Sequence, residues 1–435
     1  MNEWRRVALR HVSTHIKDGT HGTHRRVESG IPLLSAKNVG RRGHLEWDKS
    51  DDLISESDYA ALTSTFAPKA GDLLLTVVGS IGRSAVFDGS RVAFQRSVAF
   101  VRSSDAVLPC YLFQVSRSED FSRQLERRCN VTAQAGLYLG ELAKISIPLP
   151  PKQQQQKIAA ILTSIDTAIE KTEALIAKYQ QIKAGLMHDL FTRGVLPNGQ
   201  LRPLRERAPA LYQETAIGWI PRAWRLTQAG HLCSLITKGT TPTSADMWES
   251  SEGIRFLRVD NLTFDGRFDF TASSYRISEL THTTALSRSK CFPGDVLMNI
   301  VGPPLGKVSL VTPETGEVNI NQAIAIFRPT VSLSSTYLLR WLLSSGARRW
   351  LLQRAKQTSG QLNLTLAMCQ ELEIPLPSIE EQELMESRLQ AAEGLIQSEQ
   401  TRLSKLQTQK LGLMQDLLTG KVAVRADAPA PEAAA

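Results

Sequence analysis

The sequence KYQQIKAGLMHDLFTRGV, at Lys178–Val195, returns as KLQTQKLGLMQDLLTGKV at Lys405–Val422. Ten of the eighteen paired residues are identical at an offset of 227, where ordinary residue frequencies would give about one. Self-similarity over so long a period indicates a duplicated architecture. The chain is therefore predicted to contain two copies of one unit.

Three shorter blocks repeat in the same order upstream of this match, at offsets between 220 and 227. Because their order is preserved, the duplication covers nearly the whole chain. The blocks, first copy and then second, are Ile145–Pro150 and Leu372–Pro377; Gly71–Leu74 with Gly79 and Gly82, and Gly294–Leu297 with Gly302 and Gly306; and Trp4 with Lys17–Thr20, and Trp224 with Thr237–Thr240.

Each copy begins with a globular part of short apolar runs punctuated by glycine, a pattern typical of strands. Short stretches of helical periodicity, such as Ser335–Leu352, alternate with these runs. The mixture predicts an α+β fold, with mixed α/β elements, for both globular parts. The strand-like runs include Asp72–Val78, Val92–Arg102 and Ile320–Arg328.

A long helix is predicted after the prolines that end each globular part, and the first spans about Lys152–Thr192. Apolar residues recur in steps of three and four over four or more heptads, which favours pairing with another helix. An ordinary amphipathic helix in a single core is the alternative. The apolar positions are Ile158, Ile161, Ile165, Ala168, Leu175, Tyr179, Ile182, Leu186 and Leu190, weakened at Thr172, and Leu389, Ala392, Ile396, Leu403, Leu406, Leu413 and Leu417, interrupted by Glu399 and Lys410.

These boundaries predict six parts. Globular domains span 1–151 and 216–377, and long helices span 152–195 and 378–422. Residues 196–215 carry Gly, Pro and clustered Arg, and are predicted to form an exposed linker. The tail 423–435 is mostly Ala and Pro, and is predicted to be disordered.

The composition excludes several classes of protein. The 435 residues include 51 Lys and Arg against 43 Asp and Glu, a formal charge of +8, which makes nucleic acid a partner to consider. No apolar run reaches the roughly 18 residues of a membrane span, and the first residues lack an apolar signal core, so neither a membrane protein nor a secreted one is expected. The five cysteines are far apart and odd in number, which favours reduced thiols in a cytoplasmic protein.

The sequence shows no recognisable set of catalytic residues, which favours a chain without catalytic activity of its own. A phosphate-binding GxxxxGK[ST] loop is absent from the sequence. Asn299 is separated from the prolines that follow it, so it is interpreted as part of a turn after a buried strand rather than as a base-holding residue. His21 and His24 are three apart, a spacing that fits no standard zinc helix, and no metal is expected. Asp72 and Asp295 are predicted to fix turns rather than to act as catalytic acids.

Taken together, these features resemble the specificity subunit of type I restriction-modification systems. The resemblance covers about Trp4–Val422, and depends on the repeated order of globular domain and long helix together with three local motifs. The second copy departs in one loop, where Pro303, Pro304 and Lys307 replace Ser80, Ile81 and Arg83. The motifs are the run at 71–83, Ile147–Pro151 followed by Gln155, and Ile374–Pro377 followed by Glu381 and Gln382.

The resemblance implies a DNA-reading adaptor: two target-recognition domains separated by two long antiparallel coiled-coil helices. Each domain would recognise one half of a split sequence in double-stranded DNA. The helices would dock two methyltransferase subunits, and restriction (motor-nuclease) subunits would join the assembly. The chain itself would bind no cofactor, since S-adenosylmethionine, ATP and magnesium belong to partner subunits. Helices of about 40 residues are about 60 Å long, which would span roughly 18 base pairs.

The candidate DNA-contacting residues are polar side chains in the matched loops. The hydroxyl groups of Ser and Thr can hydrogen-bond to phosphates and to either base edge, while Arg and Lys can bind guanine or phosphate. The candidate partner-binding residues are two equivalent Gly-Leu-Met triplets, which we expect to be exposed on the helices. The DNA candidates are Lys17, Thr20, His21, Thr23, His24, Arg25, Arg26, Ser80 and Arg83 in the first copy and Lys238, Thr240, Thr241, Thr243, Ser244 and Lys307 in the second; the partner candidates are Gly185, Leu186, Met187, Gly412, Leu413 and Met414.

Two other classes of protein remain as alternatives at this point. A self-contained restriction or modification enzyme would need methyl-donor and nuclease motifs, which are missing from the sequence. A structural coiled-coil scaffold would read no DNA sequence, and a footprint on random-sequence DNA would then yield no selected motif.

Overall fold

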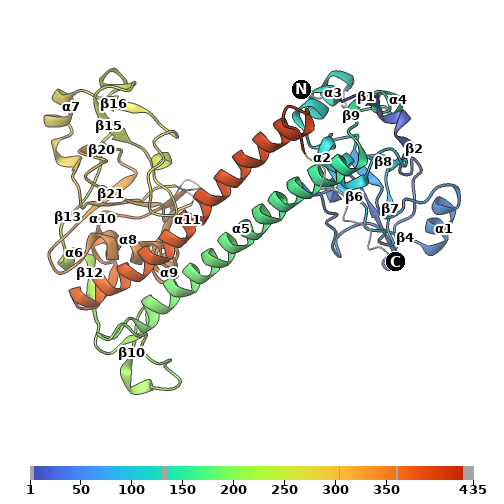
Figure 1. Cartoon of the computed structure of the whole chain (residues 1–435). Helices are drawn as coiled ribbons and strands as arrows, with labels where there is room; N and C mark the ends of the chain where they lie inside the picture. The colour runs from blue at the N-terminus through green and yellow to red at the C-terminus, as the bar shows by residue number, and fades with distance from the viewer. Residues whose placement is uncertain (1–3, 130–135, 303, 359–360, 425–435) are drawn as a thin grey trace, which may run out of the picture. The chain divides into compact units, whose positions relative to one another are not determined.

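The computed structural model describes residues 4–129, 136–302, 304–358 and 361–424 (Figure 1). The chain forms two compact units, one of residues 1–174 with 400–435 and one of residues 175–399. Two long helices, α5 (Lys152–Arg193) and α11 (Ile379–Leu418), each contribute one part to each unit. The tail predicted to be disordered lies, from residue 425 onward, outside the described residues.

The first unit is built on a four-stranded antiparallel sheet in the order β2-β8-β5-β6 and a three-stranded sheet in the order β4-β3-β7, where β3 and β7 run parallel. Leu34, Phe94 and Phe100 join the two sheets in one buried cluster. A short ladder between β1 and β9 closes the domain just before α5 begins. The elements are β1 (Arg6–Ala8), η1 (Leu9–His11), β2 (Ser13–Asp18), β3 (Ile31–Leu34), η2 (Ala36–Asn38), β4 (Leu53–Ile54), α1 (Glu56–Thr65), β5 (Leu73–Thr76), β6 (Ser84–Val86), β7 (Ala93–Phe94), β8 (Val98–Ser103), α2 (Pro109–Ser116), α3 (Glu119–Arg128), α4 (Leu139–Leu142) and β9 (Ser146–Pro148).

The second unit repeats this plan. Its sheets follow the orders β13-β21-β18-β19 and β14-β16-β15-β20-β17, with β15 and β20 parallel, and a β12-β24 ladder precedes α11. Leu257, Ile320 and Ile326 occupy the places of Leu34, Phe94 and Phe100 in the core. The elements are η3 (Pro209–Leu211), β10 (Tyr212–Thr215), β11 (Gly218–Pro221), β12 (Arg225–Gln228), α6 (Ala229–Leu232), β13 (Cys233–Lys238), η4 (Ser244–Asp246), β14 (Met247–Glu249), β15 (Ile254–Leu257), η5 (Val259–Asn261), β16 (Tyr275–Ile277), α7 (Glu279–Thr283), η6 (Ser287–Ser289), β17 (Lys290–Cys291), β18 (Val296–Asn299), β19 (Val308–Leu310), β20 (Val318–Ile320), β21 (Ile324–Pro329), α8 (Ser335–Leu343), α9 (Ser345–Arg354), β22 (Lys356–Thr358), β23 (Gln361–Asn363), α10 (Leu366–Gln370) and β24 (Glu373–Leu376).

The long helices belong to the cores of the globular parts. In the first unit, Ile158 near the start of α5 and Leu417 near the end of α11 share one buried cluster. In the second unit, Leu190 near the end of α5 and Leu389 near the start of α11 do the same. The two helices therefore run antiparallel, as expected for the duplicated plan.

A buried glutamine anchors the start of each long helix. The Gln155 side chain accepts a hydrogen bond from the Leu108 amide at 2.8 Å and donates to the carbonyl of Pro150. Gln382 repeats this arrangement by accepting from the Ser334 amide at 2.8 Å. Because a buried amide is stable only when its polar atoms are paired, each glutamine ties its helix to the domain that precedes it. These are the glutamines that follow the Pro-Leu-Pro motifs of the sequence.

Three sequence expectations about the helices are corrected. The apolar face of α5 includes buried Ile176, while Ile182 is 50% exposed, because the buried positions follow the packing of the unit rather than an ideal heptad. Thr172 is buried, and its hydroxyl donates to the carbonyl of Ala168 at 2.8 Å, so it does not weaken the contact. The helical stretch predicted at Ser335–Leu352 is two helices, since Ser344 ends α8 and caps α9.

The segment predicted to be an exposed linker, 196–215, is exposed at most of its residues but is anchored to the second unit by two buried ones. Arg202 and Tyr212 are each less than 10% exposed. Arg202 donates to both carboxylate oxygens of Glu381, a residue that lies near the start of α11, and its Nη2 is 2.9 Å from Oε2. The ion pair folds the segment onto the second unit. Composition alone missed it because the partner lies 179 residues away.

Candidate nucleic-acid interface

The end of β2 and the polar loop after it hold seven of the residues predicted to contact DNA. Three of them, Lys17, Thr23 and Arg25, are exposed, and their side chains form no hydrogen bond or ion pair within the described part of the chain. The others support the loop: Thr20 hydrogen-bonds His24 at 2.8 Å, His21 binds Asp18 at 2.8 Å, and Arg26 binds Asp52 at 2.8 Å. The loop is therefore held in shape by some candidates and presents the rest to solvent.

Gly19 sets this loop against the turn between β7 and β8. A Cβ atom at residue 19 would overlap the carbonyl oxygens of Phe94 and Gln95, so the close approach requires glycine. The Thr20 amide donates to the carbonyl of Phe94 at 2.8 Å, and the Arg96 amide donates back to the carbonyl of Thr20 at 3.0 Å. The contact places Arg96 beside the predicted DNA-contacting loop.

A hollow of about 480 Å³ opens next to this contact. Asp18, His21, Arg96 and Tyr138 are among the residues that line it, and Tyr138 is 69% exposed. An exposed aromatic ring beside an arginine is a suitable surface for a nucleic-acid base. Arg96 and Tyr138 were not among the sequence candidates, because neither belongs to a repeated motif.

The second unit presents the matched loop after β13. Lys238, Thr240, Thr241, Thr243 and Ser244 are all exposed. Two of the hydroxyl groups also bind within the unit: Thr241 donates to the Gln322 side chain, and Thr243 donates to Asp246 at 2.6 Å. Gly239 again approaches the neighbouring turn, since a Cβ there would overlap the carbonyl oxygens of Ile320 and Asn321.

The glycine-containing loops after β5 and β18 are stabilised by equivalent side chains. In the first unit, Thr76 accepts from the Arg83 amide at 2.9 Å and donates to the carbonyl of Ser80. In the second unit, buried Asn299 accepts from the amides of Gly306 and Lys307, each at 2.9 Å. Asn299 thus fixes a turn after a buried strand, as predicted. The Lys307 side chain reaches the carbonyl of Val259 at 3.3 Å, so part of its hydrogen-bonding capacity is used internally.

Asp72 and Asp295 fix turns, as predicted. Asp72 is buried, accepts from the Lys69 amide at 2.8 Å and forms a bidentate pair with Arg102 at 2.9 and 2.7 Å. Asp295 forms the same pair with Arg328 at 2.7 Å for both bonds. The pair raises the pKa of each arginine, with the aspartate hydrogen bond as the main cause. Both carboxylates are therefore engaged in ion pairs and hydrogen bonds that stabilise the fold.

The described residues contain no cluster of His, Cys, Asp or Glu that could hold a metal ion. All five cysteines lie in the described part of the chain and carry free thiols. Burial raises the pKa of Cys233 and of Cys369 to about 12, so both thiols stay protonated and unreactive at neutral pH. Across the residues that the structure covers, no helix is long and apolar enough to cross a membrane.

The Gly-Leu-Met triplets are less exposed than the sequence suggested. Gly185 and Gly412 are exposed, and a Cβ at either would meet open space. Met414, however, is 8% exposed and belongs to the core of the first unit, and Leu186 packs against the core of the second. The expected exposure is therefore wrong for Met414, because the apolar members of the triplets serve the packing of the helices.

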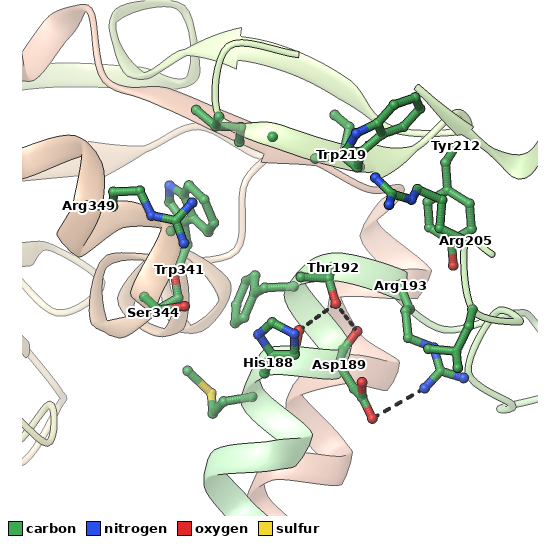
Figure 2. Close-up of a pocket in the computed structure, with 18 of the residues that line it drawn as sticks. His188, Asp189, Thr192, Arg193, Arg205, Tyr212, Trp219, Trp341, Ser344 and Arg349 are labelled. Atoms are coloured by element: carbon green, nitrogen blue, oxygen red, sulfur yellow. Dashed lines mark hydrogen bonds and ion pairs between the residues drawn. The ribbon is translucent and has the colours of Figure 1, made fainter. Parts of the chain in front are cut away.

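The larger hollow of the second unit, about 640 Å³, lies at the C-terminal end of α5 and brings no sequence candidate for DNA contact together (Figure 2). Arg205 lies over the ring of Trp219, 4.8 Å from its centroid, and Asp189 pairs with Arg193 at 3.3 Å. Most of its charged groups thus have partners within the unit, which indicates a packing hollow rather than a reactive site.

The duplicated framework agrees with a comparison against protein families. The family model described as type I restriction modification DNA specificity domain matches residues 28–181 and again residues 228–408. The chain belongs to this family. As a type I specificity protein it recognises DNA target sequences and is the non-catalytic member of its complexes, which implies DNA and methyltransferase as partners.

Relatives of the specificity family match over most of the chain. A putative type I restriction enzyme MjaX specificity subunit from Methanocaldococcus jannaschii is 22% identical, and the match covers 97% of this chain and 94% of the relative. The MjaVIII specificity subunit of the same organism is 26% identical over 65% of this chain and 63% of the relative. The EcoBI specificity subunit of Escherichia coli is 27% identical over 54% of this chain and 49% of the relative.

Solved structures share the fold. A chain from a study of complex assembly and conformational transition in a type I system aligns over 97% of this chain and 99% of its own length, with a TM-score of 0.61 and 17% identity. The type I S subunit from M. genitalium aligns over 96% of both chains, with a TM-score of 0.56 and 15% identity. The resemblance, the mixed α/β fold with two family domains and the non-catalytic role predicted from the sequence are confirmed.

Proposed function

We propose that each unit reads one half of a two-part DNA sequence and that α5 and α11 set the spacing between the halves. The observation that carries the proposal is the repeated contact of Gly19 and Gly239, which supports equivalent polar loops against equivalent turns. Each globular domain, 1–151 and 216–377 in this proposal, also carries an excess of cations over acids, which favours contact with DNA phosphates.

Within the loops, free and exposed side chains are the best candidates for DNA contact. Arg25→Ala should weaken binding, since Arg25 has no competing partner within the described residues. A base contact would cost about 1–3 kcal/mol and relax one position of the target, whereas a phosphate contact would weaken all sequences alike and lower the salt slope. Unchanged affinity and salt slope would remove Arg25 from the interface.

The long helices are proposed to dock two methyltransferase subunits, through which restriction subunits join. Support comes from the duplicated helices and from exposed apolar side chains on them: Ile182, Leu395 and Leu411 are each at least half exposed. Gly185 and Gly412 lie on the same helices with open space beside them. The two Gly-Leu-Met triplets remain the proposed docking places, with glycine rather than methionine at the surface.

Docking can be tested by native mass spectrometry of the full chain with saturating methyltransferase. Two copies per chain are expected. Gly185→Arg and Gly412→Arg should each reduce binding to one copy, while Gly185→Ala and Gly412→Ala serve as matched controls that keep the surface flat. A limit of one copy for the unmodified chain would overturn the proposal of two equivalent sites.

We further propose that the protein acts in the cytoplasm, where its DNA and partner subunits would be. Free and largely buried thiols are consistent with a reducing compartment.

The two-part target is tested by mapping methylated adenines genome-wide in cells that express this chain with its methyltransferase. The expected result is one motif of two specific segments separated by an unread spacer of constant length. A single continuous motif, or methylation without any motif, would refute the proposal.

A further inference from the structure

The same three-residue turn occurs once in each unit, and its middle residue differs. Gln95–Ser97 connects β7 to β8, and Asn321–Ala323 connects β20 to β21. In the first turn the Gln95 amide donates to the carbonyl of Leu34 at 2.8 Å, and in the second the Asn321 amide donates to the carbonyl of Leu257 at 3.0 Å. The middle residues are Arg96 and Gln322.

The backbone around both turns is fixed in the same way. The Val98 amide donates to the carbonyl of Gln95 at 3.0 Å, and the Ile324 amide donates to the carbonyl of Asn321 at 3.2 Å. Each turn also receives the close approach of a glycine, Gly19 or Gly239, from the neighbouring loop. The position of the middle residue is therefore set by the framework and not by its own side chain.

Both middle residues are exposed beside the loop proposed to contact DNA. In the first unit, no carboxylate among the described residues pairs with Arg96, and the Asp18 carboxylate, which lines the same hollow, is bound by His21. In the second unit, the Gln322 carbonyl accepts from Thr241, which orients the amide from the loop. The Arg96 guanidinium and the Gln322 side-chain amide therefore both keep N–H donors that can bind a ligand.

The chemistry of the two side chains differs in the way that two half-sites would require. Arginine binds the O6 and N7 acceptors of guanine with two parallel hydrogen bonds, and glutamine pairs with N7 and N6 of adenine. The loop residues around each turn are identical in the two units: Gly19 matches Gly239, and Thr20 matches Thr240. The middle residues of the turns, 96 and 322, differ. The same backbone structure can recognise two different sequences when it presents a different base-contacting side chain in each unit.

We propose that Arg96 and Gln322 are matched base-reading residues, with Arg96 reading a guanine in one half-site and Gln322 an adenine in the other. The inference rests on the proposed two-part target and deepens it by naming a specificity-determining residue in each unit.

The test is a selection of bound sequences from random DNA by the full chain with its methyltransferase, compared among the unmodified chain, Arg96→Gln and Gln322→Arg. Arg96→Gln should change one position of one half-site from guanine toward adenine, and Gln322→Arg should make the opposite change in the other half-site. The preference at that position should shift about 5- to 150-fold. The unaltered half-site reports that each variant is folded.

Matched controls use the same substitutions elsewhere on the surface. Arg91→Gln lies at the other end of β7, where Arg91 pairs with Glu56, and Gln353→Arg lies on an exposed position of α9. Neither should change the target. If Arg96→Gln and Gln322→Arg leave the target unchanged, or weaken all sequences alike, the base-reading assignment is overturned while the two-part target stands. If the unmodified chain selects no two-part sequence, the proposed function itself is overturned.

Discussion

Glu393 of α11 forms a bidentate ion pair with Arg340 of α8, with both N···O distances at 2.7 Å. Lys183 of α5 binds the same carboxylate at 2.5 Å. Burial alone would raise the pKa of Glu393, but hydrogen bonds from Arg340 and Lys183 hold it below its ordinary value. One carboxylate thus connects the globular part of the second unit to both long helices.

The first unit has an equivalent group at the matched positions of the repeat. Asp166 of α5 pairs with Arg117 at 3.3 Å and with Lys410 of α11 at 2.5 Å. Asp166 and Glu393 are separated by the repeat offset of 227, as are Lys183 and Lys410. Burial lowers the pKa of Lys410, and the contact with Asp166 opposes that effect. Lys410, which interrupts the apolar pattern of α11, therefore has a structural partner.

Glu393→Gln and Asp166→Asn should each destabilise the unit in which they lie. Removing the carboxylate abolishes its charge-assisted hydrogen bonds to two cations, although Arg340 keeps a second pair with Glu386 at 3.2 Å. The expected cost is about 1.5–3 kcal/mol. The measurement is the urea unfolding transition of the full chain, followed with probes placed in each unit. Glu383→Gln, at an exposed position of α11, is the matched control and should stay within about 0.5 kcal/mol. Equal transitions for Glu393→Gln and its control would show that the pair contributes little.

Gly19→Ala and Gly239→Ala should each disturb the reading of one half-site. The new methyl group would overlap a backbone carbonyl that cannot move without shifting its strand, so the loop must leave its turn. Gly22→Ala, in the same loop as Gly19, places its Cβ no closer than 3.4 Å to any neighbour and is the control. Sequence selection by the full chain should show a weakened half-site for each of the first two variants. If all three variants select the same DNA sequence as the unmodified chain, the loops do not contact DNA.

Stability in acid should depend on Asp51 of the first unit. The Asn38 side chain and then Lys37 donate to this buried carboxylate and lower its pKa to about 2. A pKa below the unfolded value of about 3.9 means that the contact stabilises the fold fully above that pH and is lost as the pH falls through about 2. The stability difference between the unmodified chain and Asp51→Asn should therefore be constant near neutral pH and shrink below pH 4. A difference independent of pH would contradict the assignment.

The features predicted from the sequence are those with local or repeated signals. Prolines before Lys152 and the heptads after it marked the start of α5. The motif at these prolines also included Gln155, whose anchoring role only the structure reveals. The duplicated Gly-Asp-Leu pattern located Asp72 in a turn. Each of these depends on residues that are close in the chain, so the sequence pattern carries the information.

The features missed depend on partners distant in the chain. Arg102 pairs with Asp72 across 30 residues, and Arg202 pairs with Glu381 across 179, so neither follows from local spacing. Arg96 is a single residue in a turn, and only the sheet order places it beside the loop after β2. The candidate site was therefore predicted as a set of loops but not as a constellation of side chains.

The modular proposal predicts that Met1–Pro150 can be exchanged for the matching domain of a related specificity subunit. The ends of this segment lie together, because Arg6 of β1 pairs with Pro148 of β9, so an exchange interrupts the chain only at the start of α5. A donor with residues equivalent to Leu108 and Arg117 keeps the contacts to Gln155 and Asp166.

Methylation mapping of the exchanged chain should show one new half-site, with the other half-site and the spacer length unchanged. The reason is physical: Trp224–Pro377 keeps its own sheets and its own cluster of core residues, and both long helices keep their length. The reciprocal exchange of Trp224–Pro377, whose ends are joined by the ladder of β12 and β24, is the control and should change only the opposite half. A changed spacer, or simultaneous change in both halves, would mean that the two units read DNA jointly, and the modular proposal would then fail.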